Sequence, residues 1–263
     1  MTPDMLLVSI GNTRTRIAQV QGGKLQPSRV MDNADPGTAA AIADAAQAGR
    51  EGGALPMLLA SVNSAAAEKY ETDLGRAGVS VMRFGRDVPI PVRTTLEDDS
   101  TVGHDRLLDA LGAFSRARQA CIVIDAGTAV TVDFVDGEGT FHGGVIAPGA
   151  QMMLDALHER TSALPAVRLA PEGIAPGPTP FGKTTPQAMT LGVSGAVRGL
   201  VHDLIDRYAE FYGAYPRVIA TGGDAALLFE GDELVEHIVP DLTLIGMHAA
   251  AELLEQIDEV SEE

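Results

Sequence analysis

Two short stretches, VSIGNT at Val8–Thr13 and IDAGTA at Ile124–Ala129, repeat one pattern in the two halves of the chain. Each consists of the end of an apolar strand, a polar residue, a spacer, a glycine and a small hydroxyl or amide residue. Each continues into a second strand with alternating polarity, which predicts a β-hairpin. The two glycines stand 116 residues apart in a chain of 263 residues. We interpret the pair as an internal duplication; the alternative is a chance likeness of two hairpins.

The glycine in each hairpin loop indicates a phosphate-binding function. A glycine lets the backbone approach an anion closely, so Gly11 and Gly127 could each face a phosphate group, although either could also be an ordinary turn. The pair Gly222-Gly223 follows a third predicted strand and could lie against an adenine or a ribose, or simply lead into a helix. The chain has neither a P-loop motif nor a dinucleotide-binding fingerprint after a strand. A nucleotide would therefore bind by another arrangement, between two halves.

Helices and strands alternate along the rest of the chain, which predicts an α/β layered fold. A long amphipathic helix begins either with Thr184 and Gln187 as a capping box, or with Thr185 as the cap before Pro186. Gly137–Gly149 is rich in glycine, and Pro165–Gly182 is expected to be a loop. Further helices are expected at residues 38–48, 65–77, 105–118, 151–161 and 245–257, and further strands at residues 55–62, 79–84, 120–125 and 217–221.

The composition limits the classes of protein to which the chain can belong. Its residues are 45% hydrophobic and 21% charged, which is typical of a globular protein with a large core. The formal net charge of −17 makes nucleic acid and anionic membranes improbable partners. The single cysteine, Cys121, fits a reducing compartment. No apolar run approaches ~18 residues, and Met1–Asp4 does not open a signal peptide, so we expect a cytoplasmic protein.

Two aspartates are candidates for chemistry. Asp125 ends an apolar strand, where a buried carboxylate needs a cation or a hydrogen-bond partner. Asp105 begins a predicted helix within Gly103-His104-Asp105-Arg106. It is either a helix cap or a base that accepts a hydroxyl proton, with Arg106 binding an anionic group of the substrate.

Taken together, these motifs resemble those of type III pantothenate kinases. The resemblance includes the two hairpin loops, Gly103–Arg106, Gly143–Gly149, Thr161–Pro165 and Thr221–Gly223, in matching order along almost the whole chain. It implies a fold of the actin-like ATPase and sugar kinase superfamily. In that fold, two duplicated ribonuclease-H-like halves, here 1–118 and 119–263, have mixed sheets flanked by helices. It further implies ATP-dependent phosphorylation of pantothenate, the first step of coenzyme A synthesis, with Mg²⁺, a monovalent cation (K⁺ or NH₄⁺) and a homodimer.

The resemblance also implies roles for single residues. Asp105 would accept the proton of the pantothenate hydroxyl group, and Asp125 would hold the monovalent cation. Pantothenate would contact Gly103, His104, Arg106 and Thr185. The ATP phosphates would contact Ser9, Ile10, Gly11, Asn12, Thr13, Arg14, Thr15, Arg16 and Thr128.

The chain departs from the family pattern at two places. The first motif of the family usually begins with an Asp that helps to hold Mg²⁺, and here the position is Ser9. The family usually has a Tyr and an Asn-Pro pair before the Gly-x-Asp-Arg motif, and here those positions are Leu96, Asp98 and Asp99. These departures keep two alternatives open: a catalytically weak relative that binds nucleotide or pantothenate with a regulatory role, and a kinase that acts on another small alcohol.

Overall fold

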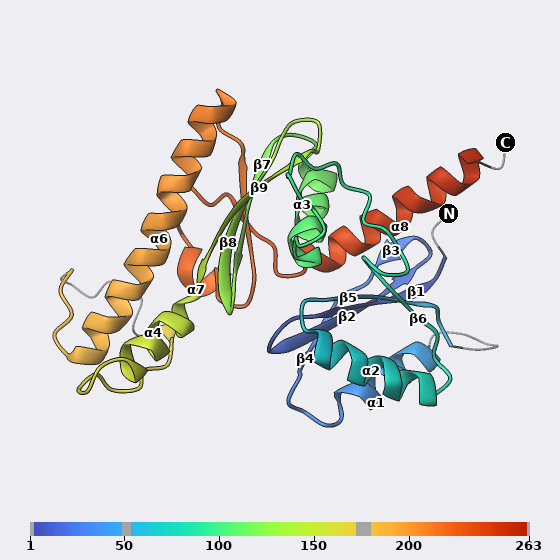
Figure 1. Cartoon of the computed structure of the whole chain (residues 1–263), viewed down its shortest axis with the longest axis horizontal. Coiled ribbons are helices and arrows are strands. Elements are labelled where there is room, and N and C mark those ends of the chain that lie inside the picture. The colour runs from blue at the N-terminus through green and yellow to red at the C-terminus, as the bar shows by residue number, and fades with distance from the viewer. Residues whose placement is uncertain (1–2, 49–53, 172–179, 262–263) are drawn as a thin grey trace. The chain divides into compact units, whose positions relative to one another are not determined.

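The computed structural model describes residues 3–48, 54–171 and 180–261, and its chain divides into two compact units (Figure 1). Unit 1 comprises Met1–Arg116 and Asp241–Glu263, and unit 2 comprises Ala117–Pro240. The predicted halves, 1–118 and 119–263, differ from these units at the C-terminus, because the last helix packs with unit 1. Residues 172–179, in the expected Pro/Gly-rich loop, lie outside the described residues.

Unit 1 contains one mixed sheet in the order β3-β2-β1-β5-β6, and β4 also pairs with β2. The hairpin of β1 and β2 is antiparallel, whereas β1, β5 and β6 run parallel. All five residues of β5 are buried, as predicted for an apolar strand inside a parallel sheet. The strands are β1 (Met5–Ile10), β2 (Arg14–Gln21), β3 (Lys24–Leu25), β4 (Arg29–Asp32), β5 (Met57–Ser61) and β6 (Val81–Arg83).

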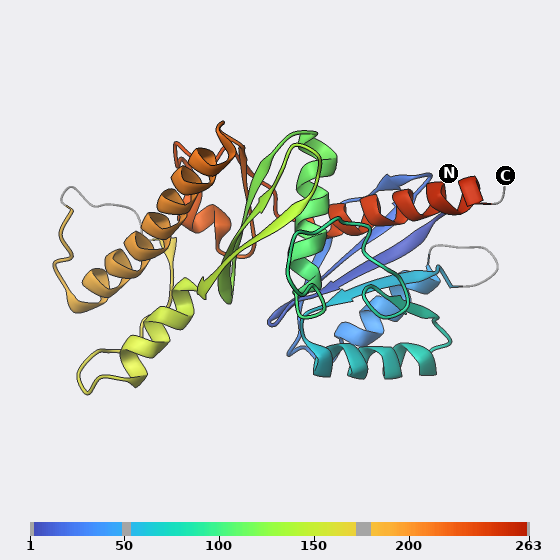
Figure 2. The same ribbon diagram turned by 45° about the horizontal axis from the view of Figure 1, so that its top comes forward.

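Helices cover both faces of this sheet because its central strands are apolar on both sides. Leu6 and Val8 of β1 pack against α1 (Thr38–Gln47) and α2 (Ser64–Arg76). Leu7, between them, points to the opposite face, which packs against α3 (His104–Ala117) and α8 (Leu242–Ser261). Figures 1 and 2 show α1 and α2 on one side of the sheet and α8 on the other.

Glycines let α3 and α8 approach each other at backbone distance. A Cβ atom on Gly112 would lie 2.6 Å from the carbonyl oxygen of Leu242, and one on Gly246 would overlap the carbonyl oxygen of Leu108. The buried carboxylate of Asp109 accepts a hydrogen bond from the Thr243 hydroxyl group at 2.7 Å across the same crossing. These contacts attach the C-terminal helix to unit 1.

Unit 2 has a second mixed sheet in the order β11-β10-β7-β8-β9. Three helices pack on one face of it through a single apolar cluster: α4 (Ala150–Glu159), α6 (Thr185–Tyr212) and α7 (Ala225–Phe229). Thr184 is the N-cap of α6 and accepts the N–H of Gln187, which confirms the first of the two predicted helix starts. The strands are β7 (Cys121–Ala126), β8 (Ala129–Val135), β9 (Phe141–Pro148), β10 (Arg217–Thr221) and β11 (His237–Ile238).

The two sheets have the same topology. In each, the first strand forms an antiparallel hairpin with the second and runs parallel to a later strand, which is itself parallel to the next one. Strands β1, β2, β5 and β6 thus correspond to β7, β8, β10 and β11. This shared order is what the predicted duplication requires, and it makes a chance likeness of the two hairpins a poor explanation.

Strand β9 lies within the stretch Gly137–Gly149, where the sequence predicts only glycine enrichment. A Cβ atom on Gly144 would collide with the neighbouring strand β8, so glycine is needed for the pairing. A register irregularity between Phe134 and Val135 accompanies the left-handed backbone of Gly143 (φ 88°). In the described part of the chain, no helix combines the length and the hydropathy needed to cross a membrane.

Candidate active site

The first candidate loop closes the hairpin between β1 and β2. Gly11 donates its N–H to the carbonyl oxygen of Arg14 at 2.9 Å, and Asn12 and Thr13 stand exposed at the tip. Because β1, β5 and β6 are parallel, they end at the same edge of the unit 1 sheet. Ligands of open α/β sheets bind at this carboxyl edge. The tip is therefore placed where a phosphate-binding loop is expected.

Asn33 holds this loop, although sequence reasoning does not find it. Its amide nitrogen Nδ2 donates to the carbonyl oxygen of Gly11 at 2.8 Å, and its oxygen Oδ1 accepts from the Thr15 hydroxyl group at 2.7 Å. Its backbone N–H donates to the carbonyl oxygen of Thr13 at 3.0 Å. Asn33 follows β4, and only the pairing of β4 with β2 brings it to the loop. No local signal in the sequence marks this contact.

The predicted phosphate-contact residues divide into an exposed tip and a supporting base. Thr15 is fully buried, so its side chain supports the loop from inside. Arg16 forms an ion pair with Asp241, at 3.0 Å between Nη1 and Oδ1. Ser9 is half-buried and lies opposite Arg16 in the hairpin register. Ile10 is buried in the core.

Asp105 lies in the first turn of α3 and is half-buried. Its oxygen Oδ1 accepts the N–H of Arg106 at 2.9 Å, and a Cβ atom on Gly103 would lie 2.5 Å from that oxygen. Gly103 thus leaves the space into which the carboxylate folds. Desolvation raises the pKa of Asp105 above its ordinary value, and the hydrogen bond and charge of Arg106 offset only part of this rise. A carboxyl group with a raised pKa is a stronger base than an ordinary aspartate.

The segment that leads into α3 carries the second set of departures from the family pattern. Leu96 is half-buried, whereas Asp98 and Asp99 are exposed. The carboxylate of Asp98 accepts the N–H of Ser100 at 2.9 Å, and hydrogen bonds with Ser100 hold the pKa of Asp98 below its ordinary value. The carbonyl oxygen of Asp99 accepts the N–H of Val102 at 3.3 Å. These acidic residues shape the turn before Gly103-His104.

Three glycine-containing loops meet at the carboxyl end of β7 in unit 2. Gly127 donates its N–H to the carbonyl oxygen of Ala129 at 2.9 Å, and Gly149 donates to the carbonyl oxygen of Thr128 at 3.1 Å. A Cβ atom on Gly149 would lie 2.5 Å from the oxygen of Thr128, and one on Gly222 (φ 97°) would overlap the oxygen of Ala126. Any larger residue at either glycine would push the loops apart. The three loops therefore pack backbone against backbone at this end of the strand.

Asp125 lies at the same end of β7, between its register partners Thr131 and Thr221. A Cβ atom on Gly222 would overlap its oxygen Oδ1 together with the carbonyl oxygen of Ala126, so two oxygen atoms converge on the space that a side chain would fill. Oxygen donors with one negative charge suit a monovalent cation. In the residues that the structure describes, no group of three or more His, Cys, Asp or Glu could hold a metal ion.

Thr185 occupies the first turn of α6 and is exposed. Pro186 has no N–H and the Gln187 N–H donates to Thr184, so the exposed Thr185 hydroxyl group is the donor that this end could offer to a ligand. His104 is also half-buried, and its ring lies against the backbone of Gly85. The structure thus places most of the predicted residues at the carboxyl edges of the two sheets or in the first turn of a helix.

Comparisons with known proteins agree on the family and on the fold. The sequence model of the type III pantothenate kinase family matches residues 5–207. The type III pantothenate kinase of Akkermansia muciniphila is 42% identical over 153 residues, which cover 58% of this chain and 61% of that protein. The match thus spans about three fifths of the length of such curated relatives.

Two solved structures resemble this chain in fold alone. One is a Campylobacter jejuni protein described as belonging to the Baf family of transcriptional activators, with a TM-score of 0.61 and 18% identity, covering 96% of this chain and 100% of that one. The other is MreB 5 of Spiroplasma citri bound to AMPPNP, with a TM-score of 0.52 and 12% identity, covering 100% and 99%. The α/β fold with two mixed sheets flanked by helices agrees with the prediction and is shared with these proteins. Because the family model matches more than three quarters of its length, the chain belongs to the type III pantothenate kinase family.

Proposed function

We propose that this chain transfers the γ-phosphoryl group of ATP to the hydroxyl group of pantothenate, forming 4′-phosphopantothenate for coenzyme A synthesis. The observation that carries the proposal is family membership over residues 5–207, which include both hairpin loops and Asp105. Two further observations support it. The two sheets share one topology, and each presents a glycine-containing loop at its carboxyl edge.

The proposed reaction depends on positioning and on charge stabilisation, as phosphoryl transfer generally does. The exposed tip Asn12-Thr13 and the backbone around Thr128 would bind the ATP phosphates. Asp105, with its raised pKa, would accept the hydroxyl proton as the oxygen attacks the γ-phosphorus and ADP leaves. Gly103, His104, Arg106 and Thr185 would contact pantothenate, with Arg106 opposite its carboxylate.

Asp125 would hold a monovalent cation near the phosphates. Bound Mg²⁺ would neutralise part of the triphosphate charge. Ser9 provides a hydroxyl group where the family pattern has a carboxylate, so we expect weaker Mg²⁺ binding than in that pattern. A homodimer and a cytoplasmic location are further parts of the proposal.

An acceptor panel tests this function against the two alternatives. The purified chain is incubated with ATP, Mg²⁺ and K⁺, with pantothenate or one of several other small alcohols, and ADP release is followed above the rate without acceptor. We expect release to depend on pantothenate. Release with another alcohol alone would indicate a different acceptor, and pantothenate or ATP binding without release would indicate the catalytically weak relative.

A further inference from the structure

The imidazole ring of His104 rests on the backbone of Gly85. A Cβ atom on Gly85 would overlap the ring and lie 2.8 Å from its Nδ1 atom, and the three nearest atoms all belong to the ring. Gly85 has a left-handed backbone (φ 79°), which residues with a side chain adopt only with strain. Gly85 therefore serves two needs at once: the backbone turn and the space for the ring.

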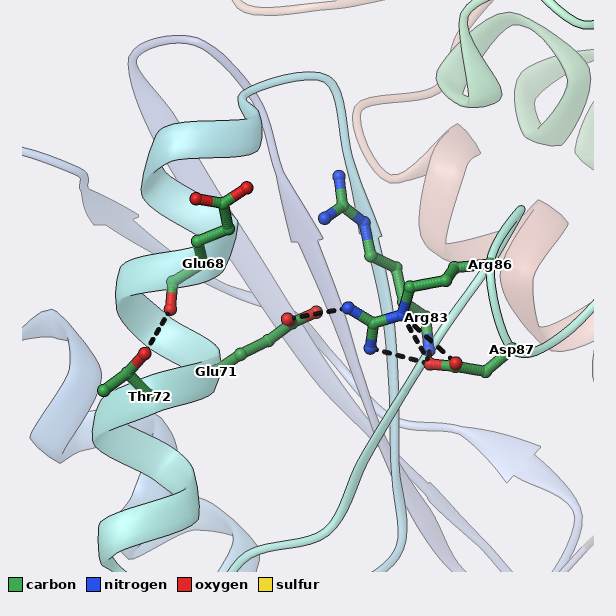
Figure 3. A network of polar contacts seen from close by, with 6 residues as sticks. All are labelled: Glu68, Glu71, Thr72, Arg83, Arg86 and Asp87. Atoms are coloured by element: carbon green, nitrogen blue, oxygen red, sulfur yellow. Dashed lines mark hydrogen bonds and ion pairs between the residues drawn. The ribbon is translucent and has the colours of Figure 1, made fainter.

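The turn that contains Gly85 is held by a network of charged groups (Figure 3). The Asp87 carboxylate accepts the backbone N–H of Arg83 at 2.9 Å and the guanidinium Nη2 of Arg86 at 2.8 Å. The same guanidinium donates from Nη1 to Glu71 of α2 at 2.9 Å. Figure 3 shows the Arg86 side chain lying between Glu71 and Asp87. The turn after β6 is thus fixed both to itself and to a helix.

Backbone hydrogen bonds hold the start of the turn as well. Gly85 donates its N–H to the carbonyl oxygen of Val88 at 2.8 Å, and Phe84, fully buried, donates to the carbonyl oxygen of Leu59 in β5 at 2.9 Å. The backbone under the His104 ring therefore belongs to the carboxyl edge of the unit 1 sheet. The His104 ring thus packs on a backbone that several hydrogen bonds hold in place.

His104 is the first residue of α3, and Asp105 is the next. A ring fixed on Gly85 restricts the backbone at the start of the helix, and with it the direction of the Asp105 carboxylate over Gly103. We propose that Gly85 is a positioning residue, and that the turn held by Arg86, Asp87 and Glu71 acts through His104 to orient Asp105. The proposal rests on the proposed kinase function, because it assigns a role in that reaction.

The test compares two glycines that share a backbone conformation. Gly78 has φ 76° and no atom within 4 Å of the place where a Cβ atom would stand, whereas Gly85 has the His104 ring there. Gly85→Ala and Gly78→Ala therefore carry similar backbone strain, and only Gly85→Ala displaces the His104 ring.

Gly85→Ala is also made in a His104→Ala background, where no ring remains to be displaced. The readouts are kcat and KM for both substrates and the NMR signal of the His104 ring, assigned by its loss in His104→Ala.

We expect Gly85→Ala to lower kcat by about 10-fold relative to Gly78→Ala, below the ~100-fold that a 1 Å displacement can cost. KM for ATP should stay within about 2-fold, because the β1–β2 loop is untouched. In the His104→Ala background the effect of Gly85→Ala should shrink to about 3-fold or less. The His104 ring signal should move in Gly85→Ala and stay in place in Gly78→Ala.

Equal losses from Gly85→Ala in both backgrounds, or equal effects of the two glycine substitutions, would overturn the proposal. If Gly85→Ala does not fold, Glu71→Gln replaces it, with Asp73→Asn of the exposed Asp73–Arg76 pair on the same helix as the control. The His104 signal must then move only in Glu71→Gln. If the wild-type chain makes no phosphopantothenate, the proposed function is wrong. In that case, the NMR signal of the His104 ring alone tests whether Gly85 positions this ring.

Discussion

At the scale of single residues, Asp105 combines a cost in stability with a proposed gain in reactivity. Its pKa is raised by desolvation from an ordinary value of 3.8, so the folded chain holds this proton more tightly than the unfolded chain. Ionisation of the group therefore opposes folding. The penalty is absent below the ordinary pKa, grows as the pH rises towards the raised pKa, and is complete above it.

We predict that Asp105→Asn is more stable than the wild-type chain at pH 8, and that its advantage is smaller at pH 5. The asparagine cannot ionise, so the variant avoids the desolvation of a charge. Urea unfolding at both pH values measures this difference in free energy. Asp73→Asn, at a half-buried position of α2, is the control for the loss of a carboxylate elsewhere in unit 1. A wild-type chain that is more stable than Asp105→Asn at pH 8 would contradict the assigned environment.

Ser9 allows a second prediction at this scale. Replacing its hydroxyl group by a carboxylate should strengthen Mg²⁺ binding, because carboxylate oxygens are preferred ligands of this ion. We expect Ser9→Asp to lower the Mg²⁺ concentration for half-maximal turnover by roughly 10-fold, at the low end of effects from changed metal surroundings. The neutral variant Ser9→Asn should leave it unchanged. If Arg16, the register partner of Ser9, captures the new carboxylate instead, Ser9→Asp and Ser9→Asn will behave alike, against the prediction.

At the scale of secondary structure elements, the close packing of α8 against α3 places the C-terminal helix in unit 1. Gly246→Ala would place a methyl group against the carbonyl oxygen of Leu108, so we predict a loss of about 1–3 kcal/mol in the free energy of unfolding. Gly199→Ala, in α6 with open space around it, should instead gain about 0.5–1 kcal/mol. Calorimetric unfolding of both variants checks the pair. Equal effects of the two substitutions would mean that α8 does not pack on α3 this closely.

The sequence predicts the secondary structure elements better than the contacts between residues that are distant in the chain. Alternation of apolar residues predicts both hairpins and most helices, because these patterns depend on neighbours a few positions apart. Asn33 could not be found in this way, since it lies 22 residues from Gly11 and only strand pairing brings the two together. Gly85 is likewise unmarked, because the ring that it accommodates comes from His104. The amphipathic pattern of α8 indicates one buried face without indicating the sheet that it covers.

At the scale of the whole molecule, the repeated loop pattern proved to reflect a repeated topology. The pairing order of β2, β1, β5 and β6 corresponds to that of β8, β7, β10 and β11, including the parallel strand that returns after each hairpin. In each unit, the hairpin therefore places a glycine-containing loop at the edge of the sheet where ligands of α/β folds bind. Duplication accounts for candidate ATP-contact residues in both units, at Gly11 and at Thr128. The proposed base, Asp105, lies in α3, outside the repeated hairpins.

The most direct measurement is mass spectrometric detection of phosphopantothenate, formed from ATP and pantothenate by the wild-type chain and by Asp105→Asn, with Mg²⁺ and K⁺ present. The account predicts that the wild-type chain forms the product and that Asp105→Asn forms it at least about 100-fold more slowly, the lower end of general-base effects. A wild-type chain that forms no product, or an Asp105→Asn variant that forms it at the wild-type rate, would contradict the account.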